Sequence, residues 1–271
     1  MPTRLLSAAS LERFVPGIAF LVYVLALMWL LVRFLRREDA LGRGLNLVLT
    51  GHPAEAEQVF RKALAAGGRM KPDERRRLLT SLGDALMDMG RYEESRQCLE
   101  SALAMGDPTG SCRSSLADLW LMLGREPDKA LEMANQAVEA STDGLGEIDS
   151  LGIGYRWMSD ILRAGLWAQR AQALAGLGRM SESQESIGFA VRLASGAREL
   201  LSGRWRPRRL LFIVATIGVS QTYWRIGMAC LAMGKLDDAR DSFSIGSDAD
   251  AKRKYGARCR QQLAQMGVPV G

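Results

Sequence analysis

A spacing of about 34 residues recurs five times along this 271-residue chain and constrains its fold more than any other feature. The five copies run over residues 37–70, 76–109, 110–144, 164–197 and 220–253. Each copy carries a glycine at the same place, and these glycines are Gly51, Gly90, Gly124, Gly178 and Gly234. Glycine readily adopts the left-handed backbone that ends a helix, so we expect each of them to close one helix before a turn. A fixed period of this length indicates a repeat architecture.

Two further positions of the repeat predict how the helices pack. The eighth position is always small: Gly44, Gly83, Ala117, Ala171 and Gly227. The twenty-fourth position is larger in four of the five copies: Phe60, Leu99, Ala134, Ile187 and Phe243. Antiparallel helices approach closely only where small side chains face each other. The sequence therefore predicts tight helix pairs, with residues such as Phe60 and Phe243 filling the space against the neighbouring pair.

The pattern resembles the tetratricopeptide repeat, in which a W-x2-L-G-x2-Y segment is followed by alanine and phenylalanine positions. The second copy follows it with Leu79, Leu82, Gly83, Leu86, Ser95, Leu99 and Ala102, and Pro108 lies just past its end. The tryptophan-like and tyrosine-like positions are mostly aliphatic. The resemblance implies an all-α, helix-turn-helix solenoid over residues 37–253. We expect a capping helix at 254–271, with residues 252–254 contributing to its polar outer face.

About twenty extra residues precede the fourth copy, and a similar number precede the fifth. These inserts cover residues 145–163 and 198–219. They could be lengthened helices or loops with a separate function, and the helical pattern of residues 158–177 favours lengthened helices.

Residues 15–32 contain no charge and read VPGIAFLVYVLALMWLLV. A helix of that length spans roughly 27 Å, close to the hydrocarbon core of a bilayer. The run ends in arginines instead of a small-residue cleavage site, so we expect a transmembrane anchor at residues 15–36 behind a tail at 1–14. Slightly more arginine follows the anchor than precedes it. This favours a solenoid on the cytoplasmic side of the membrane, with the opposite topology left open.

No catalytic, cofactor or metal site is expected. His52 is the only histidine, and the four cysteines are scattered without a CxxC pair. The glycine pairs of residues 144–154 follow no strand pattern and lack the lysine of a phosphate-binding loop. A nucleotide site and an enzymatic activity are therefore not predicted.

The resemblance also implies a concave groove lined by the first helix of each pair. The candidate partner-binding residues are Arg77, Thr80, Asp84, Met87, Asp88, Ser114, Asp118, Met122, Gln172, Trp224 and Met228. Methionines mixed with a few acids suit an amphipathic helix or an extended peptide. The alternative is that several of these side chains belong to the core.

A second candidate surface is the segment RWRPRR. Its members are Arg204, Trp205, Arg206, Arg208 and Arg209, and the last third of the chain, residues 195–271, carries 13 basic against 6 acidic residues. Such a segment could lie on anionic lipid, with nucleic acid a less favoured target. The sequence thus predicts a membrane-anchored scaffold or assembly factor that binds subunits of a membrane-associated complex. The alternative function is recruitment of an anionic partner through the basic C-terminal third.

Overall fold

The structure is a computed structural model, and it describes residues 40–66, 70–144, 153–202, 209–250 and 252–268. The predicted tail at 1–14 and the predicted anchor at 15–36 lie outside these residues. Among the helices that are described, none combines the length and the apolar character needed to cross a membrane.

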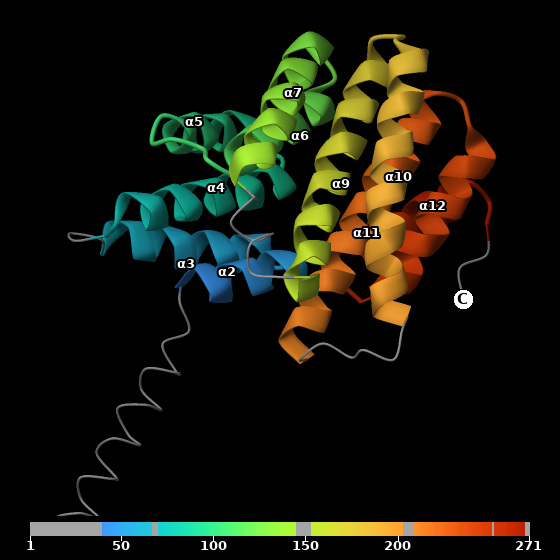
Figure 1. Ribbon diagram of the computed structural model, residues 1–271. Coiled ribbons are helices and arrows are strands. Elements are labelled where there is room, and N and C mark those ends of the chain that lie inside the picture. Colours follow the sequence, from blue (N-terminus) through green and yellow to red (C-terminus); the bar gives the residue numbers. More distant parts are fainter. Residues whose placement is uncertain (1–39, 67–69, 145–152, 203–208, 251, 269–271) are drawn as a thin grey trace, which may run out of the picture.

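The described chain folds into five helix pairs and a last helix (Figure 1). The pairs are α2 (Ala40–Leu49) with α3 (Pro53–Ala65), α4 (Pro72–Asp88) with α5 (Tyr92–Leu103), α6 (Ser111–Leu123) with α7 (Pro127–Gly144), α9 (Ile153–Gly176) with α10 (Met180–Ser202), and α11 (Arg209–Ala232) with α12 (Leu236–Ala249). The last helix is α13 (Lys254–Gln265). The predicted all-α solenoid of helix-turn-helix units is therefore confirmed for the described residues.

The five repeat glycines all adopt the left-handed backbone that the sequence predicts. Their φ angles lie between the 62° of Gly124 and the 87° of Gly51. Each one ends the first helix of its pair, and the second helix begins within three residues of it. A residue with a Cβ would be strained at these turns, which explains why glycine recurs there.

The small eighth position allows each pair to close. A Cβ added at Gly44 would lie 2.1 Å from the Phe60 ring, and one added at Gly227 would lie 2.5 Å from the Phe243 ring. Both rings are fully buried. Phe60 also belongs to a core cluster that includes Leu78 of the next pair, so the ring serves its own pair and the neighbouring one.

Two of the repeats add a buried hydrogen bond at the same place. Ser95 Oγ donates to the Gly83 carbonyl at 2.8 Å, and Ser183 Oγ donates to the Ala171 carbonyl at 2.8 Å. In both cases the twentieth residue of the repeat bonds to the eighth. A small hydroxyl side chain therefore joins the two helices without separating them.

The described parts of both inserts belong to long helices, as the helical pattern favoured, whereas residues 145–152 and 203–208 lie outside the described chain. Residues 153–163 open the 24-residue helix α9, and residues 209–219 open the 24-residue helix α11. Residues 198–202 end α10, which has 23 residues. Helices α9, α10 and α11 are therefore longer than any helix of the first three pairs, and Figure 1 shows α9 and α10 running across the direction of α2 to α5.

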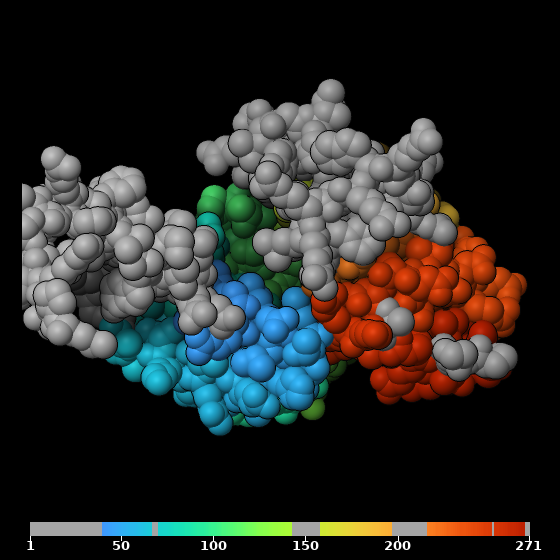
Figure 2. Space-filling view, turned by 90° about the horizontal axis from the view of Figure 1, so that it is seen from below, coloured from blue at the N-terminus to red at the C-terminus, as the bar shows by residue number. Residues whose placement is uncertain are grey.

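The described chain curves until its two ends meet. Figure 2 shows residues of α2, in blue, adjoining residues near the C-terminus, in red. A narrow crevice between the ends is lined by Leu49 of α2, Ile217 of α11 and Tyr255 of α13, among others. Helix α13 packs on α11 and α12, and its Cys259 is fully buried.

One expectation about the end of the chain is wrong. The side chain of Lys254 is only 12% exposed and points toward α4, where it pairs with Asp88. It does not contribute to a polar outer face. The reason is the curvature of the solenoid, which brings the acidic first half opposite the basic last helix.

Candidate partner-binding surfaces

The predicted groove residues lie on the first helices of four pairs. Helix α4 carries Arg77, Thr80, Asp84, Met87 and Asp88; α6 carries Ser114, Asp118 and Met122; α9 carries Gln172; α11 carries Trp224 and Met228. These helices surround the interior of the curved solenoid. Several of the side chains meet residues of α9, α11 and α13 there, and they form a polar cluster.

Asp118 lies at the centre of this polar cluster. It forms an ion pair with Arg225 of α11, and Gln169 Nε2 donates to its other carboxylate oxygen at 2.6 Å. Arg225 is buried, and it also donates to the Gly165 carbonyl at 3.2 Å. Its Nε has no hydrogen-bond partner among the described residues. Asp118 therefore neutralises a buried guanidinium, and Ser114 Oγ completes the cluster by donating to Gln169 Oε1 at 3.0 Å.

Asp88 joins the first half of the chain to its last helix. One carboxylate oxygen lies 2.6 Å from Lys254 Nζ, and the other lies 3.0 Å from an Arg258 guanidinium nitrogen. The Asp88 side chain is only 9% exposed. Because Asp88 and Arg258 are 170 residues apart in the sequence, this contact closes the solenoid on itself.

Asp84 lies one helical turn before Asp88, deep within the molecule but with part of its surface still exposed. Burial raises the pKa of Asp84 to about 6, although a hydrogen bond with Ser115 and the charge of Lys254 act in the opposite direction. The carboxyl group consequently keeps its proton in the folded protein at pH values where an unfolded aspartate has lost it.

This raised pKa predicts a pH-dependent stability difference for Asp84→Asn. Between pH values of about 4 and 6 the folded state binds more protons at Asp84 than the unfolded state, so the wild-type protein loses stability as pH rises through this window. Asparagine cannot ionise. We expect Asp84→Asn to match the wild type near pH 4 and to be more stable by about 1–2 kcal/mol near pH 7.5. Urea unfolding at both pH values measures the difference. A variant that is less stable at the higher pH would contradict the assigned pKa.

Other predicted groove residues divide between core and surface. Thr80 is buried, donates to the Arg76 carbonyl at 3.0 Å and contacts the Cys112 thiol. Met87 is buried in a core cluster. The alternative that some of these residues belong to the core therefore holds for Thr80 and Met87.

The remaining predicted residues are at least partly exposed to solvent. Arg77 is exposed and pairs with Asp73 at 2.9 Å, and Met122 is 42% exposed. Gln172, Trp224 and Met228 are half-buried. The structure does not present the predicted residues as one open groove, and a role for them in binding a partner stays a prediction.

The cations of this polar cluster were missed by sequence reasoning, although a signal for them exists. Asp84 and Asp88 are four residues apart on α4, and Lys254 and Arg258 are four residues apart on α13. This spacing places each pair on one face of its helix. Arg225 is the only charged side chain in α11 after its first residue. A lone charge in an apolar helix suggests a buried partner.

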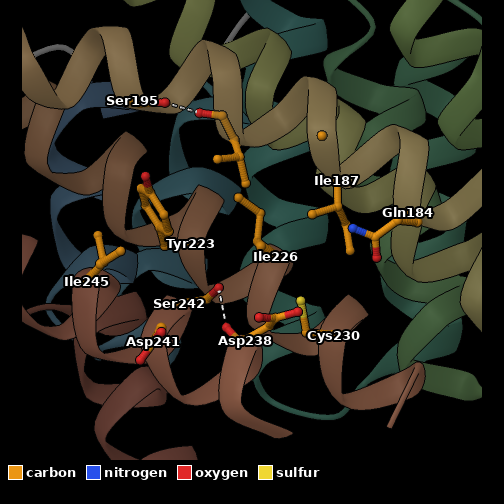
Figure 3. A pocket seen from close by; sticks show the side chains of 12 residues that line it. Gln184, Ile187, Ser195, Tyr223, Ile226, Cys230, Asp238, Asp241, Ser242 and Ile245 are labelled. Atoms are coloured by element: carbon orange, nitrogen blue, oxygen red, sulfur yellow. Dashed lines mark hydrogen bonds between the residues drawn. The ribbon is translucent and has the colours of Figure 1, made fainter. Parts of the chain in front are cut away.

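A second surface lies between the second helices of the fourth and fifth pairs. Helices α10 and α12 diverge there over α11, and they leave a groove of about 540 Å³ (Figure 3). Tyr223, Ile226 and Cys230 of α11 form its floor. Burial, with a smaller contribution from Asp238, raises the pKa of the Cys230 thiol to about 11, so this thiol is protonated at neutral pH.

The predicted basic surface is mostly outside the described residues. This applies to Arg204, Trp205, Arg206 and Arg208, while Arg209 is the first residue of α11. Basic residues farther along the chain pair internally. Besides Arg225, Lys254 and Arg258, Arg240 pairs with Asp237 and Arg253 pairs with Asp250. In the part of the chain that the structure describes, no group of three or more histidines, cysteines and acids is placed to hold a metal ion.

One family model matches the first part of the chain. Residues 40–147 match the model of the family described as "Tetratrico peptide repeat", a stretch that holds the first three helix pairs. Similar solved structures include two of the nearly identical TPR-like repeats named after a kinesin light chain of Podosopora anserina. Each is 15% identical to this chain and has a TM-score of 0.46. Each match spans 80% of this chain, and it spans 95% of one matched chain and 96% of the other. Comparison with curated proteins gives no match.

Proposed function

We propose that this protein is a membrane-anchored scaffold or assembly factor that holds partner proteins of a membrane-associated complex. The observation that carries the proposal is the stack of five helix pairs, of which the first three match the tetratricopeptide repeat family. Repeats of this kind expose an extended surface on which other proteins bind. The proposal gives the chain a binding role and no catalytic one.

The anchor rests on the sequence of residues 15–36. The charge-free run of 18 residues within it is long enough for one membrane crossing. The excess of arginine behind it supports a solenoid on the cytoplasmic side. Helix α2 begins at Ala40, only four residues after the proposed anchor ends, so the solenoid would lie near the bilayer surface.

Recruitment of an anionic partner is the less favoured function. Five basic residues between 225 and 258 form internal ion pairs and are not free for a phosphate or a lipid headgroup. Within residues 204–209, only Arg209 belongs to the described chain.

Membrane fractionation with the full chain tests the proposal. We expect the chain to pellet with membranes after an alkaline wash and to be released by detergent together with other membrane proteins in fixed proportion. Deleting residues 15–36 should move the chain to the soluble fraction while its helical circular dichroism is retained. Recovery of the full chain from the soluble fraction, without any companion, would contradict both the anchor and the scaffold. A reporter fused to the C-terminus would show on which side of the membrane the solenoid lies.

A further inference from the structure

The groove between α10 and α12 has the geometry of a docking site for a helix. Its walls come from two helices that scarcely touch each other, and residues of α11 lie between the walls at the base of the groove (Figure 3). On the α10 side the lining residues include Gln184, Ile187, Val191 and Ser195, which follow one another at helical spacing along a single face. Such a face extends over several turns, so a partner helix would find contacts along its length.

The inner surface of the groove is mainly apolar. Ile187 and Val191 line one wall, Ile245 lines the other, and Ile226 lies on the floor. Val191 is 38% exposed, although it is a large aliphatic side chain. The volume of about 540 Å³ falls within the range of cavities that bind ligands, and it is open along the surface of the protein. This surface therefore suits the apolar face of a partner.

Gly188 widens the groove at its middle. It lies inside α10, where glycine is unfavourable relative to alanine, and its backbone is not left-handed. A Cβ at this position would meet only an Arg192 nitrogen, at 3.5 Å. The packing of the chain itself therefore does not require glycine there. An absent side chain does allow another backbone to approach closely.

One edge of the groove is acidic. Asp238 and Asp241 line it from α12, both are exposed, and neither forms an ion pair within the described ranges. Two cations lie beside the α10 wall: Arg192 lies over the Phe189 ring at 4.5 Å, and Lys235 donates a hydrogen bond to Gln184, which lines the groove. Asp238 and Asp241 form no ion pair in the described chain, so along this edge two carboxylates remain available to cations of a partner, although the whole chain has a net charge of +6.

We propose that this groove binds an amphipathic α-helix of a partner protein, with an apolar face inserted between α10 and α12 and lysines or arginines beside Asp238 and Asp241. This inference rests on the proposed scaffold function and names the surface and the chemistry of the partner.

Two synthetic peptides of about 18 residues serve as probes, a length at which isolated helices become viable. Both place leucines on one face; the first has lysines on the other face and the second has glutamates. Their affinities for the full chain are measured by fluorescence anisotropy in a neutral detergent at fixed concentration, which affects every variant equally. We expect the lysine peptide to bind more tightly, although the net charge of the chain favours the glutamate peptide.

Matched variants locate the binding. Gly188→Leu fills the groove and should weaken binding of the lysine peptide at least about tenfold. Gly196→Leu changes another glycine of α10 that does not line the groove, and it should have no effect. Asp241→Lys should weaken the lysine peptide and strengthen the glutamate peptide by about threefold to tenfold each. Glu139→Lys makes the same charge change on α7, which contributes no residue to the groove, and should alter neither affinity.

Hydrogen exchange supplies a second measurement that does not depend on variants. The bound lysine peptide should slow exchange in residues 184–195 and 238–245. Equal binding of the two peptides, unchanged affinity in Gly188→Leu, or protection elsewhere would overturn the proposal. Self-association of the chain that Gly188→Leu abolishes would assign the groove to a second copy and would also overturn it. Because these experiments use peptides, their failure leaves membrane fractionation as an independent test of the scaffold function.

Discussion

Replacing Asp118 by alanine is expected to lower the free energy of unfolding by about 3–5 kcal/mol, the usual cost of leaving a buried charge unpaired. Arg225 is buried and pairs with Asp118, and its Nε already has no hydrogen-bond partner among the described residues. Without the carboxylate the guanidinium must either remain uncompensated or pull α11 away from α6. Urea unfolding of the full chain, followed by circular dichroism, measures the loss.

Two variants show whether the loss comes from the buried charge. Asp237→Ala removes an aspartate from an exposed ion pair with Arg240, in which the Asp237 side chain is 91% exposed, and should cost less than about 1 kcal/mol. The double variant Asp118→Ala, Arg225→Met should recover most of the lost stability, because no buried charge is left. If Asp118→Ala alone is as stable as the wild type, Asp118 does not neutralise Arg225, and it becomes available again as a partner-binding residue.

Replacing Gly227 by alanine is expected to lower the free energy of unfolding by about 1–3 kcal/mol, although alanine is the better helix former. The added Cβ would lie 2.5 Å from the Phe243 ring, which is fully buried and cannot move aside without disturbing α12. Overpacking should therefore exceed the gain in helix propensity. The same unfolding experiment applies.

The sign of this effect should reverse when the ring is removed. Phe243→Ala alone should cost about 3–5 kcal/mol, because it leaves a cavity in the core. In that background Gly227→Ala no longer meets a ring, and it should raise the stability. Gly196→Ala is the matched control, since nothing lies within 4 Å of its added Cβ, and it should stabilise the protein by about 0.5–1 kcal/mol. A loss of stability from Gly227→Ala that persists without the ring would show that Phe243 is not the reason for the glycine.

The helix pairs could be predicted from sequence because the residues that determine each pair lie within a single repeat. Gly51 and Gly234 must adopt a left-handed backbone, and Gly44 and Gly227 must admit a phenylalanine ring. Both requirements act between residues that are close in the sequence. They therefore recur at fixed offsets and can be recognised without a structure.

The closure of the solenoid could not be predicted in the same way. The pairing of Asp88 with Lys254 depends on how much the stack curves, and the curvature is the sum of small rotations over all five pairs. The long helices α9 to α11 change those rotations in the second half of the chain. Asp84, Asp88 and Asp118 consequently read as groove residues in the sequence, whereas in the structure they line a closed interior.

The groove at α10 and α12 was missed for a related reason. The repeat pattern identifies Ile187 as a core residue, and it is indeed 6% exposed. Whether the second helices of adjacent pairs touch or diverge depends on their crossing angle, and no repeat position encodes that angle. Gly188 was the available signal, because a glycine inside a long helix has no reason in the repeat pattern.

Carbodiimide cross-linking of the full chain in native membranes, analysed by mass spectrometry, tests most directly whether this is a closed solenoid that binds partners on its outer face. The reagent links a carboxylate to an amine only where the two are in contact. We expect Asp88 to be joined to Lys254 of the same chain, from which it is 2.6 Å away, and Asp238 or Asp241 to be joined to lysines of membrane proteins. Cross-links from Asp88 to lysines of other proteins, with none from Asp238 or Asp241, would contradict both the closed interior and the outer binding site.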